Sequence, residues 1–219
     1  MNTSSKIVQL KIRLLGVSPM IWRRVLVPAT VSLRELHGVI QVVMGWEGYH
    51  LFLFDIRAVQ YGSFDLHVQS PEMSLEQFEF RKNDRFSYIY DMGDHWEHEV
   101  RVEAFIALEA KKSYPVCTGG TGACPPEDCG GPYGYLARRD ETESYEAWTD
   151  MGAMEGFLKD VLDADDPTRP VSDFMSDDVA AAMERMVARA PFVDGSFTRG
   201  DVNKRLRAKE HLEMMHQQM

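Results

Sequence analysis

Acidic residues and histidines gather in two short segments of the sequence, DMGDHWEH at 91–98 and PPEDCG at 125–130. Carboxylate oxygens are preferred ligands of Mg²⁺ and Ca²⁺, and a metal-bound water can attack an ester or phosphodiester. Asp55 could approach the same residues. We define a candidate functional surface from the two segments and one earlier histidine: Asp91, Asp94, His95, His98, Glu127, Asp128 and His50.

Turn chemistry offers a simpler interpretation of these residues. Asp91 and Asp94 flank Gly93, and aspartates often accept hydrogen bonds from nearby turn amides. No activated nucleophile beside a base is visible in the sequence. The leading hypothesis is therefore a non-enzymatic binding or accessory protein that contacts another protein through this surface. The alternative is a metal-dependent hydrolase or nuclease that uses Asp91, Asp94, His98, Glu127 and Asp128.

Three familiar catalytic motifs can be set aside. HWEHE places its histidines three residues apart on an expected strand, whereas a zinc protease needs a spacing of four on a helix. The segment GGTGACPPEDCGGPYG lacks the Gly-Lys-Ser/Thr ending of a phosphate-binding loop. Serine recombination would need an arginine-rich site, but Arg23 and Arg24 are adjacent on a strand and point to opposite faces.

The three cysteines leave a zinc site open. Cys117, Cys124 and Cys129 lack the Cys-x2-Cys pairing of most structural zinc sites, although a histidine such as His95 or His98 could complete a tetrahedral set. Packed, reduced thiols explain the same residues, so no cofactor is expected and zinc is the alternative. An odd cysteine count argues against a disulfide framework.

Net charge and hydropathy restrict the partners. The formal charge of −10 and the isoelectric point near 5.2 oppose binding to phosphate backbones. One basic cluster occurs near the end of the chain, and it is followed by Glu210 and Glu213: Lys204, Arg205, Arg207 and Lys209. We interpret it as a solvated helix face, with DNA binding there as the weakest function hypothesis. No membrane span or signal segment is evident, so a cytoplasmic protein is expected.

Hydrophobic periodicity predicts the elements that position the candidate surface. Alternation predicts strands over residues 7–15 and 96–104, and extended apolar or β-branched runs predict others over 21–27, 50–56 and 86–91, with 62–84 as an irregular surface excursion. Ser32 and Glu35 form a capping box at the start of a helix that ends at Gly45. Trp96 and His98 share the inward face of their strand. The order of elements predicts an α+β fold with a β-grasp-like mixed sheet packed on one main helix.

Beyond the sheet, the sequence predicts a long ordered loop and a helical region. Residues 111–135 are rich in Cys, Pro and Gly and are expected to lack regular structure. Helical spacing follows at 145–162, 177–189 and 201–217. The cluster of Asp and Pro after residue 162 suggests two domains: an α+β domain over 1–162 and a helical C-terminal extension over 163–219, packed on it or appended to it.

Four strings in order carry a family resemblance: PMIWRRVLVP, the helix ending in MGW, YIYDMGDHWEHEV and YPVCTGGTGACPPEDCGGPYGY. Together they resemble the plasmid pRiA open-reading-frame-three family, also labelled insertion-sequence passenger proteins of the TnpR type. The resemblance runs from about residue 6 to 150 and implies a fold and an association with mobile elements, without an established activity. Relatives often carry a second histidine where this chain has Phe52.

Overall fold

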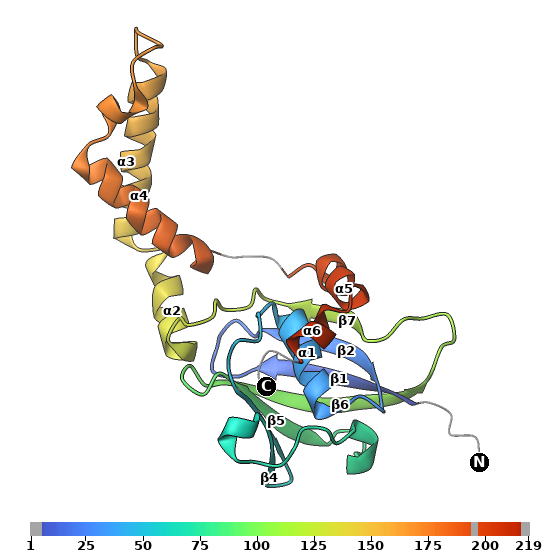
Figure 1. Cartoon of the computed structure of the whole chain (residues 1–219). Coiled ribbons are helices and arrows are strands. Elements are labelled where there is room, and N and C mark those ends of the chain that lie inside the picture. Colours follow the sequence, from blue (N-terminus) through green and yellow to red (C-terminus); the bar gives the residue numbers. More distant parts are fainter. Residues whose placement is uncertain (1–5, 194–196, 216–219) are drawn as a thin grey trace. The chain divides into compact units, whose positions relative to one another are not determined.

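The computed structural model describes residues 6–193 and 197–215 and contains two compact units (Figure 1). The first comprises Met1–Pro132 and Ser196–Met219, and the second comprises Tyr133–Gly195. Each is described here by itself. The division into domains at residue 162 stays a prediction. Among the described residues, no helix is long and apolar enough to cross a membrane.

The first two strands form as the alternating pattern predicts. β1 (Lys6–Leu14) pairs antiparallel with β2 (Trp22–Pro28), with Leu10 opposite Val25. Arg23 and Arg24 point to opposite faces, as expected from their adjacency. Arg23 is buried and donates to main-chain carbonyls that include Val43 O at 2.7 Å, whereas Arg24 pairs with Glu103 at the surface.

The predicted helix is α1 (Leu33–Met44), which has the Ser32 half of the expected capping box at its start and the expected glycine at its end. The Ser32 hydroxyl accepts from the Glu35 amide at 3.1 Å, and Gly45 ends the helix with φ of +113°. Only glycine adopts this left-handed conformation without strain. The apolar stripe of α1 is buried against the sheet. Gly38 of α1 contacts the backbone at His211, and a Cβ on residue 38 would lie 2.0 Å from the His211 carbonyl oxygen.

The sheet has seven strands in the order β4-β3-β5-β6-β1-β2-β7. The remaining strands are β3 (Phe52–Ile56), β4 (Val59–Gly62), β5 (Arg85–Tyr90), β6 (Trp96–Ala107) and β7 (Val116–Thr121). Every pair of neighbouring strands is antiparallel. The α+β class is confirmed, but the β-grasp-like mixed sheet was wrong. On the side of β1 opposite β2 lies β6, which returns antiparallel from the β5–β6 hairpin. The strand that follows α1 is β3, and it pairs with β4 and β5 instead.

The β5–β6 hairpin has the predicted inward face. Trp96, His98, Val100 and Val102 are buried, and the residues between them are only partly buried. The expected excursion at 62–84 is less irregular than its composition indicates. It contains two 3-10 helices, Phe64–Leu66 and Leu75–Phe78, and the second buries Leu75 and Phe78 against the core.

The prediction of a loop without regular structure over residues 111–135 was also wrong. Its first half contains β7, which adds to the sheet edge at β2, and its second half begins α2 (Gly131–Glu141). Strand pairing overrides the weak strand propensity of the glycines, because an open edge supplies hydrogen-bond partners. Within this range, irregular backbone remains only before β7, at residues 111–115, and in the connection between Thr121 and Gly131.

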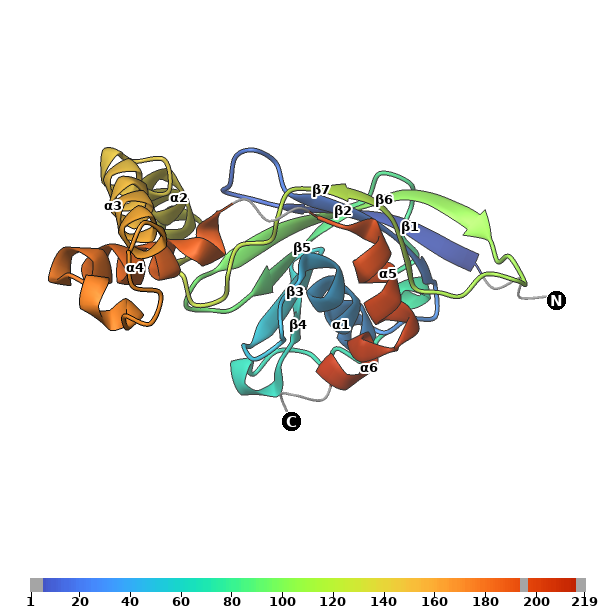
Figure 2. The same ribbon diagram turned by 90° about the horizontal axis from the view of Figure 1, so that it is seen from above.

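Three helices, not one, cover the same face of the sheet. α5 (Arg199–Arg207) and α6 (Glu210–Met214) lie beside α1, as Figure 2 shows. The single helix expected at 201–217 is broken at Lys209, whose φ is +65°. In the basic cluster, Arg205 pairs with Glu210 at 2.6 Å. Asn203 exchanges two hydrogen bonds of 2.8 Å with the Cys117 backbone and so fastens α5 to β7.

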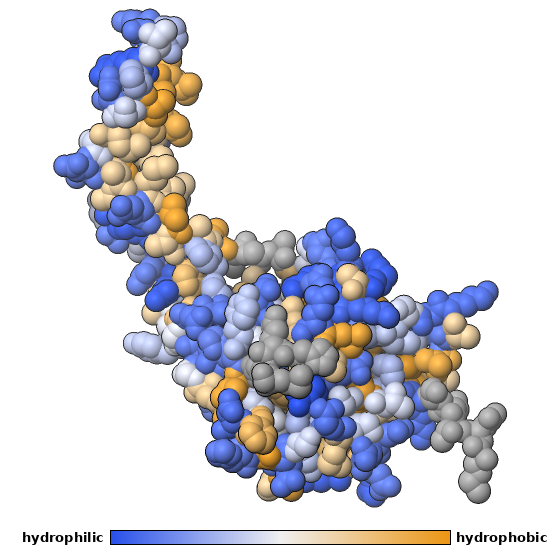
Figure 3. Space-filling view, in the orientation of Figure 1, coloured by the Kyte–Doolittle hydropathy of each residue, from blue (hydrophilic) through white to orange (hydrophobic). Residues whose placement is uncertain are grey.

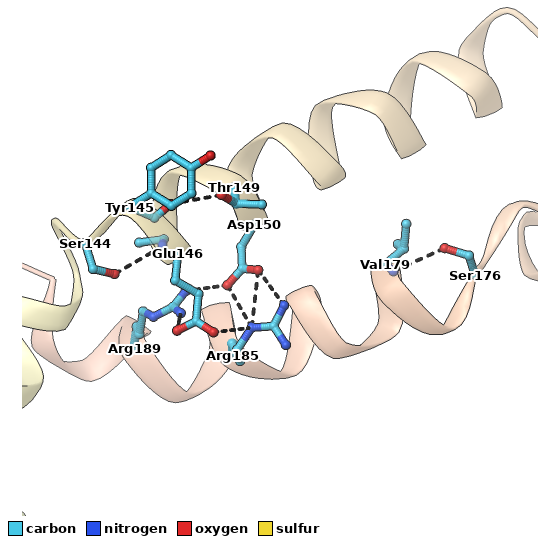
Figure 4. A network of polar contacts seen from close by, with 10 residues as sticks. Ser144, Tyr145, Glu146, Thr149, Asp150, Ser176, Val179, Arg185 and Arg189 are labelled. Carbon is cyan, nitrogen blue, oxygen red and sulfur yellow. Dashed lines mark hydrogen bonds and ion pairs between the residues drawn. The ribbon is translucent and has the colours of Figure 1, made fainter.

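The second unit is helical. After most of α2, it contains α3 (Tyr145–Leu162) and α4 (Asp177–Arg189), whose bounds match the expected ranges, with 3-10 helices at Val171–Phe174 and Ala190–Phe192. Ser144 and Ser176 cap α3 and α4. Asp150 of α3 is buried and accepts from Arg185 and Arg189 of α4 at 2.6 Å each (Figure 4).

Candidate functional site

Three of the candidate residues converge at one end of the sheet. One ligand atom each from His50, Asp91 and Asp128 lies within 4.8 Å of the others. The Nε2 atom of His50 is 3.1 Å from Asp128 Oδ1 and 3.7 Å from Asp91 Oδ2. Within the described ranges, this is the group of His, Cys, Asp and Glu residues that meets such a criterion for a metal ion. We call it the His-Asp cluster.

Asp91 is positioned by the turn of the β5–β6 hairpin. It has φ of +59°, and its Oδ1 accepts from the amides of Gly93 at 2.8 Å and Asp94 at 3.3 Å. The predicted turn chemistry is thus present, but it occupies one carboxylate oxygen. The second oxygen, Oδ2, is the one nearer to His50. Asp91 is buried, so this oxygen is also largely withdrawn from solvent.

His50 lies outside the strand that the sequence predicts for it. β3 begins only at Phe52, and His50 occupies the bend before it. Its amide contacts the Tyr90 hydroxyl at 3.4 Å, and the two rings meet edge to face with centroids 5.8 Å apart. The Nε2 atom is shielded from solvent and makes no hydrogen bond, despite its closeness to the two carboxylates.

Asp128 is brought to the cluster by the connection between β7 and α2, which is fastened at three points. The Trp46 indole donates to Pro125 O at 2.9 Å, and Glu127 Oε2 accepts from the Glu47 amide at 3.3 Å. The Gly130 amide donates to Asp94 Oδ2 at 3.1 Å. Gly131 must be glycine, because its φ is +67° and a Cβ would lie 2.3 Å from the Asp94 carbonyl oxygen.

Tyr90 and Glu127 form a second polar pair beside the cluster. The Tyr90 hydroxyl donates to Glu127, and burial, followed by this carboxylate, raises the pKa of the tyrosine. Sequence reasoning missed Tyr90, because an aromatic residue on an inward strand face is first interpreted as core. The sequence feature that could have identified this pair is its position next to the candidate aspartates: Tyr90 directly precedes Asp91, and Glu127 directly precedes Asp128.

The other candidates lie elsewhere. His98 is completely buried in the core, where its Nδ1 is 3.3 Å from Tyr88 O and its ring packs edge-on against Trp46. Burial lowers the pKa of His98 to about 4. His95 is exposed in the hairpin turn, and Asp55 lies on β3 opposite Ser87, outside the His-Asp cluster.

The three thiols do not form a compact ligand set with a histidine within the described ranges. Cys117 lies on β7, with its Sγ 3.5 Å from Gly119 O. Burial raises the pKa values of the Cys117 and Cys124 thiols. No disulfide links Cys117, Cys124 and Cys129.

Comparisons with known proteins agree on a family. The family described as "Plasmid pRiA4b ORF-3-like protein" matches residues 6–167. The uncharacterized protein y4hQ of Sinorhizobium fredii is 38% identical over 137 residues, which cover 60% of this chain and 70% of that protein. The crystal structure of MM3350 from Methanosarcina mazei Go1, a protein of unknown function, is similar with a TM-score of 0.61 and 34% identity, covering 66% of this chain and 85% of that one.

Proposed function

The chain belongs to the plasmid pRiA4b ORF-3-like family, and we propose that it is a binding protein that holds a divalent cation in the His-Asp cluster. The cation would present its open coordination positions to an oxygen ligand of a partner molecule. The observation that carries this proposal is the Nε2 atom of His50, which is buried without a hydrogen bond and faces the carboxylates of Asp91 and Asp128.

Two energetically unfavourable features of the His-Asp cluster support the proposal that it binds a cation. His50 Nε2 lies against two carboxylate oxygens but makes no hydrogen bond, so its lone pair is poorly satisfied, and a metal ion would accept that lone pair. The two carboxylates also repel each other at close range, and a divalent charge would offset that repulsion. Turn amides already hold Asp91 Oδ1, so Oδ2 is presented in a fixed orientation, as an ordered metal site requires.

The donor set indicates which cation fits. One imidazole nitrogen and two carboxylate oxygens suit Zn²⁺ or Mn²⁺, whereas Mg²⁺ favours an all-oxygen shell. Three protein ligands leave coordination positions for water or a ligand, which distinguishes such sites from closed structural zinc sites. Asp128 is exposed, so the open positions would face solvent. A partner carrying a carboxylate or phosphate oxygen could reach them.

Isothermal titration with ZnCl₂ and MnCl₂ tests the proposal, using protein made without a histidine tag and stripped with chelator. We expect binding near one ion per chain, weakened about tenfold or more in His50→Ala and Asp91→Asn. Asparagine keeps an oxygen for the Gly93 and Asp94 amides, so the second variant should preserve the turn. His67→Ala, at an exposed histidine, is the matched control. Equal affinity in His50→Ala and wild type would overturn the proposal.

A metal-dependent hydrolase is the second candidate, favoured by the Tyr90–Glu127 pair. Glu127 is half-buried and directly precedes Asp128, so it could accept a proton from a metal-bound water. Turnover of bis(4-nitrophenyl) phosphate in the presence of Zn²⁺ or Mn²⁺ would support this function if Glu127→Gln abolished turnover but kept the metal. Metal binding without turnover would leave the binding protein as the better description.

A further inference from the structure

The helical unit exposes large apolar residues along one side of α3. The positions Trp148, Met151, Leu158 and Leu162 recur at helical spacing and so form one stripe, with Trp148 68% and Leu162 82% exposed. In Figure 3, hydrophobic residues gather along one side of this unit. Glu155 falls within the same stripe, and Lys159 borders it.

The seam between α3 and α4 is polar where a helical hairpin is usually apolar. Asp150 is 1% exposed and pairs with Arg185 and Arg189, while few apolar residues of the two helices are fully buried: Ala147, Phe157 and Ala182. Figure 4 shows the carboxylate of α3 pointing at the guanidinium groups of α4. Apolar stripes normally face the partner helix. Here the stripe of α3 faces away from it.

α4 extends the apolar surface. Met183 and Val187 are exposed and, with Met175 and Ala180, line a groove of about 550 Å³. The ion pairs Glu146–Arg189 and Asp150–Arg185 show that the two helices run antiparallel. In antiparallel helices, positions displaced from the seam in the same rotational sense lie on one face of the pair. Met183 and Val187 are displaced in the same sense as Met151 and Leu158.

The charge of this unit indicates what could cover the face. Residues 133–195 contain fifteen Asp and Glu against six Lys and Arg, a net −9 of the chain's −10. Two of the arginines, Arg185 and Arg189, are already paired within the seam. Two copies of such a unit would repel each other, whereas a basic partner would be attracted. Glu155 places an acidic group within the apolar stripe itself.

Two glycines of α3 indicate a helical occupant. Gly152 and Gly156 lie one turn apart beside Trp148, and apart from the adjoining backbone of α3 no atom lies within 4 Å of where either Cβ would be. Glycine weakens a helix interior, and the packing of this unit gives no compensating reason for either residue. Small residues at this spacing allow the backbone of a second helix to approach closely.

We propose that the apolar face of α3 and α4 docks a basic amphipathic helix of another protein. The face comprises Trp148, Met151, Leu158, Leu162, Met183 and Val187. The apolar side of the incoming helix covers these residues, and its flanking Lys or Arg side chains meet the acidic groups around them. This proposal is independent of the His-Asp cluster.

The probe is a synthetic amphipathic peptide of Lys and Leu at helical spacing, with a counterpart in which Glu replaces each Lys. The Lys peptide should bind the full-length protein, shift Trp148 emission to the blue and bind more weakly as salt rises. Trp148→Ser and Leu158→Ser should each weaken binding about tenfold or more. Phe64→Ser is the matched control, because this exposed aromatic residue lies in the other unit and should leave affinity unchanged.

Three results would overturn the proposal. The first is equal affinity for the Lys and Glu peptides, and the second is equal affinity of wild type and both serine variants for the Lys peptide. The third is dimerisation of the protein alone that Trp148→Ser abolishes, since that would assign the face to a second copy. Circular dichroism of each variant must match wild type, and Trp148→Phe should retain binding as the conservative replacement.

Discussion

Asp94 and Gly130 are 36 residues apart and are joined by a hydrogen bond of 3.1 Å from the Gly130 amide to Asp94 Oδ2. This bond ties the β5–β6 hairpin, which holds Asp91, to the connection that holds Asp128. The sequence favoured turn chemistry for Asp94, with direct cation binding as the alternative. The structure instead favours a positioning role for it, because its carboxylate fastens the two segments that carry the ligands.

Replacing Asp94 by Ala should therefore weaken Zn²⁺ binding about tenfold, as loss of a residue that orients metal ligands commonly does. Asp94→Asn retains an oxygen that can accept from the Gly130 amide and should restore most of the affinity. Titration of both variants provides the measurement. Equal, undiminished affinity in the two would contradict the positioning role, whereas equal loss would assign Asp94 a direct charge interaction with the ion.

Acid stability should depend on two buried histidines. Burial lowers the pKa of His37 to about 3 and that of His98 to about 4, while an unfolded histidine titrates near 6.5. The unfolded state therefore binds more protons below pH 6.5, and stability falls as pH falls toward 4. The free energy of unfolding should drop by about 2 kcal/mol between pH 6 and pH 5.

Urea unfolding at a series of pH values measures this dependence. His98→Leu should reduce the drop between pH 6 and pH 5 by about half, or about 1 kcal/mol, since one of the two titrating groups is removed. The exposed control, His67→Ala, should leave it unchanged. The Arg185 hydrogen bond and other contacts lower the pKa of the Asp150 carboxyl to about 2. Asp150 therefore titrates below this pH range and does not contribute to the measured change in stability between pH 7 and pH 5. A stability that stays flat from pH 7 to 5 would contradict neutral burial of these histidines.

Asp150 should be the main polar support of the helical unit. Asp150→Asn removes a charge that Arg185 and Arg189 both bind, so the helical unit should be destabilised locally, although solvent around Arg185, whose side chain is 42% exposed, limits the effect. Hydrogen exchange of the α3 and α4 amides would report the loss of protection. The Glu146→Gln control removes an exposed partner of the same arginines and should change little. Equal protection in Asp150→Asn and wild type would argue against this role.

Local signals predicted the helices, but the sheet order depends on distant pairing. Ser32 and Gly45 mark the limits of α1 within a few residues of sequence, and spacing alone gave α3 and α4. The position of β6 beside β1 follows from contacts across more than eighty residues, which no local pattern encodes. β7 was missed for the same reason: its glycines resemble a loop until the edge of β2 is available.

Residue type identified the candidate site residues in the sequence, and the fold shows which of them lie together. Asp91 and Asp128 drew attention as carboxylates in glycine-rich turns, but their closeness to His50 depends on three segments that meet only in the fold. For His98, the two sequence-based expectations, burial in the core and membership of the acidic group, were incompatible. Its strand parity predicted burial, which is confirmed, and burial beneath Trp46 separates it from the acidic residues with which it had been grouped.

Anomalous diffraction from crystals grown with ZnCl₂ would test the central claim most directly, because it locates the ion without reference to activity. We predict an anomalous peak about 2.0–2.2 Å from His50 Nε2 and from one oxygen each of Asp91 and Asp128. The same peak should be much weaker in crystals of His50→Ala grown identically at limiting ZnCl₂. A peak only at other residues, or none while His50 still lies against Asp128, would contradict the assignment of the His-Asp cluster as a metal site.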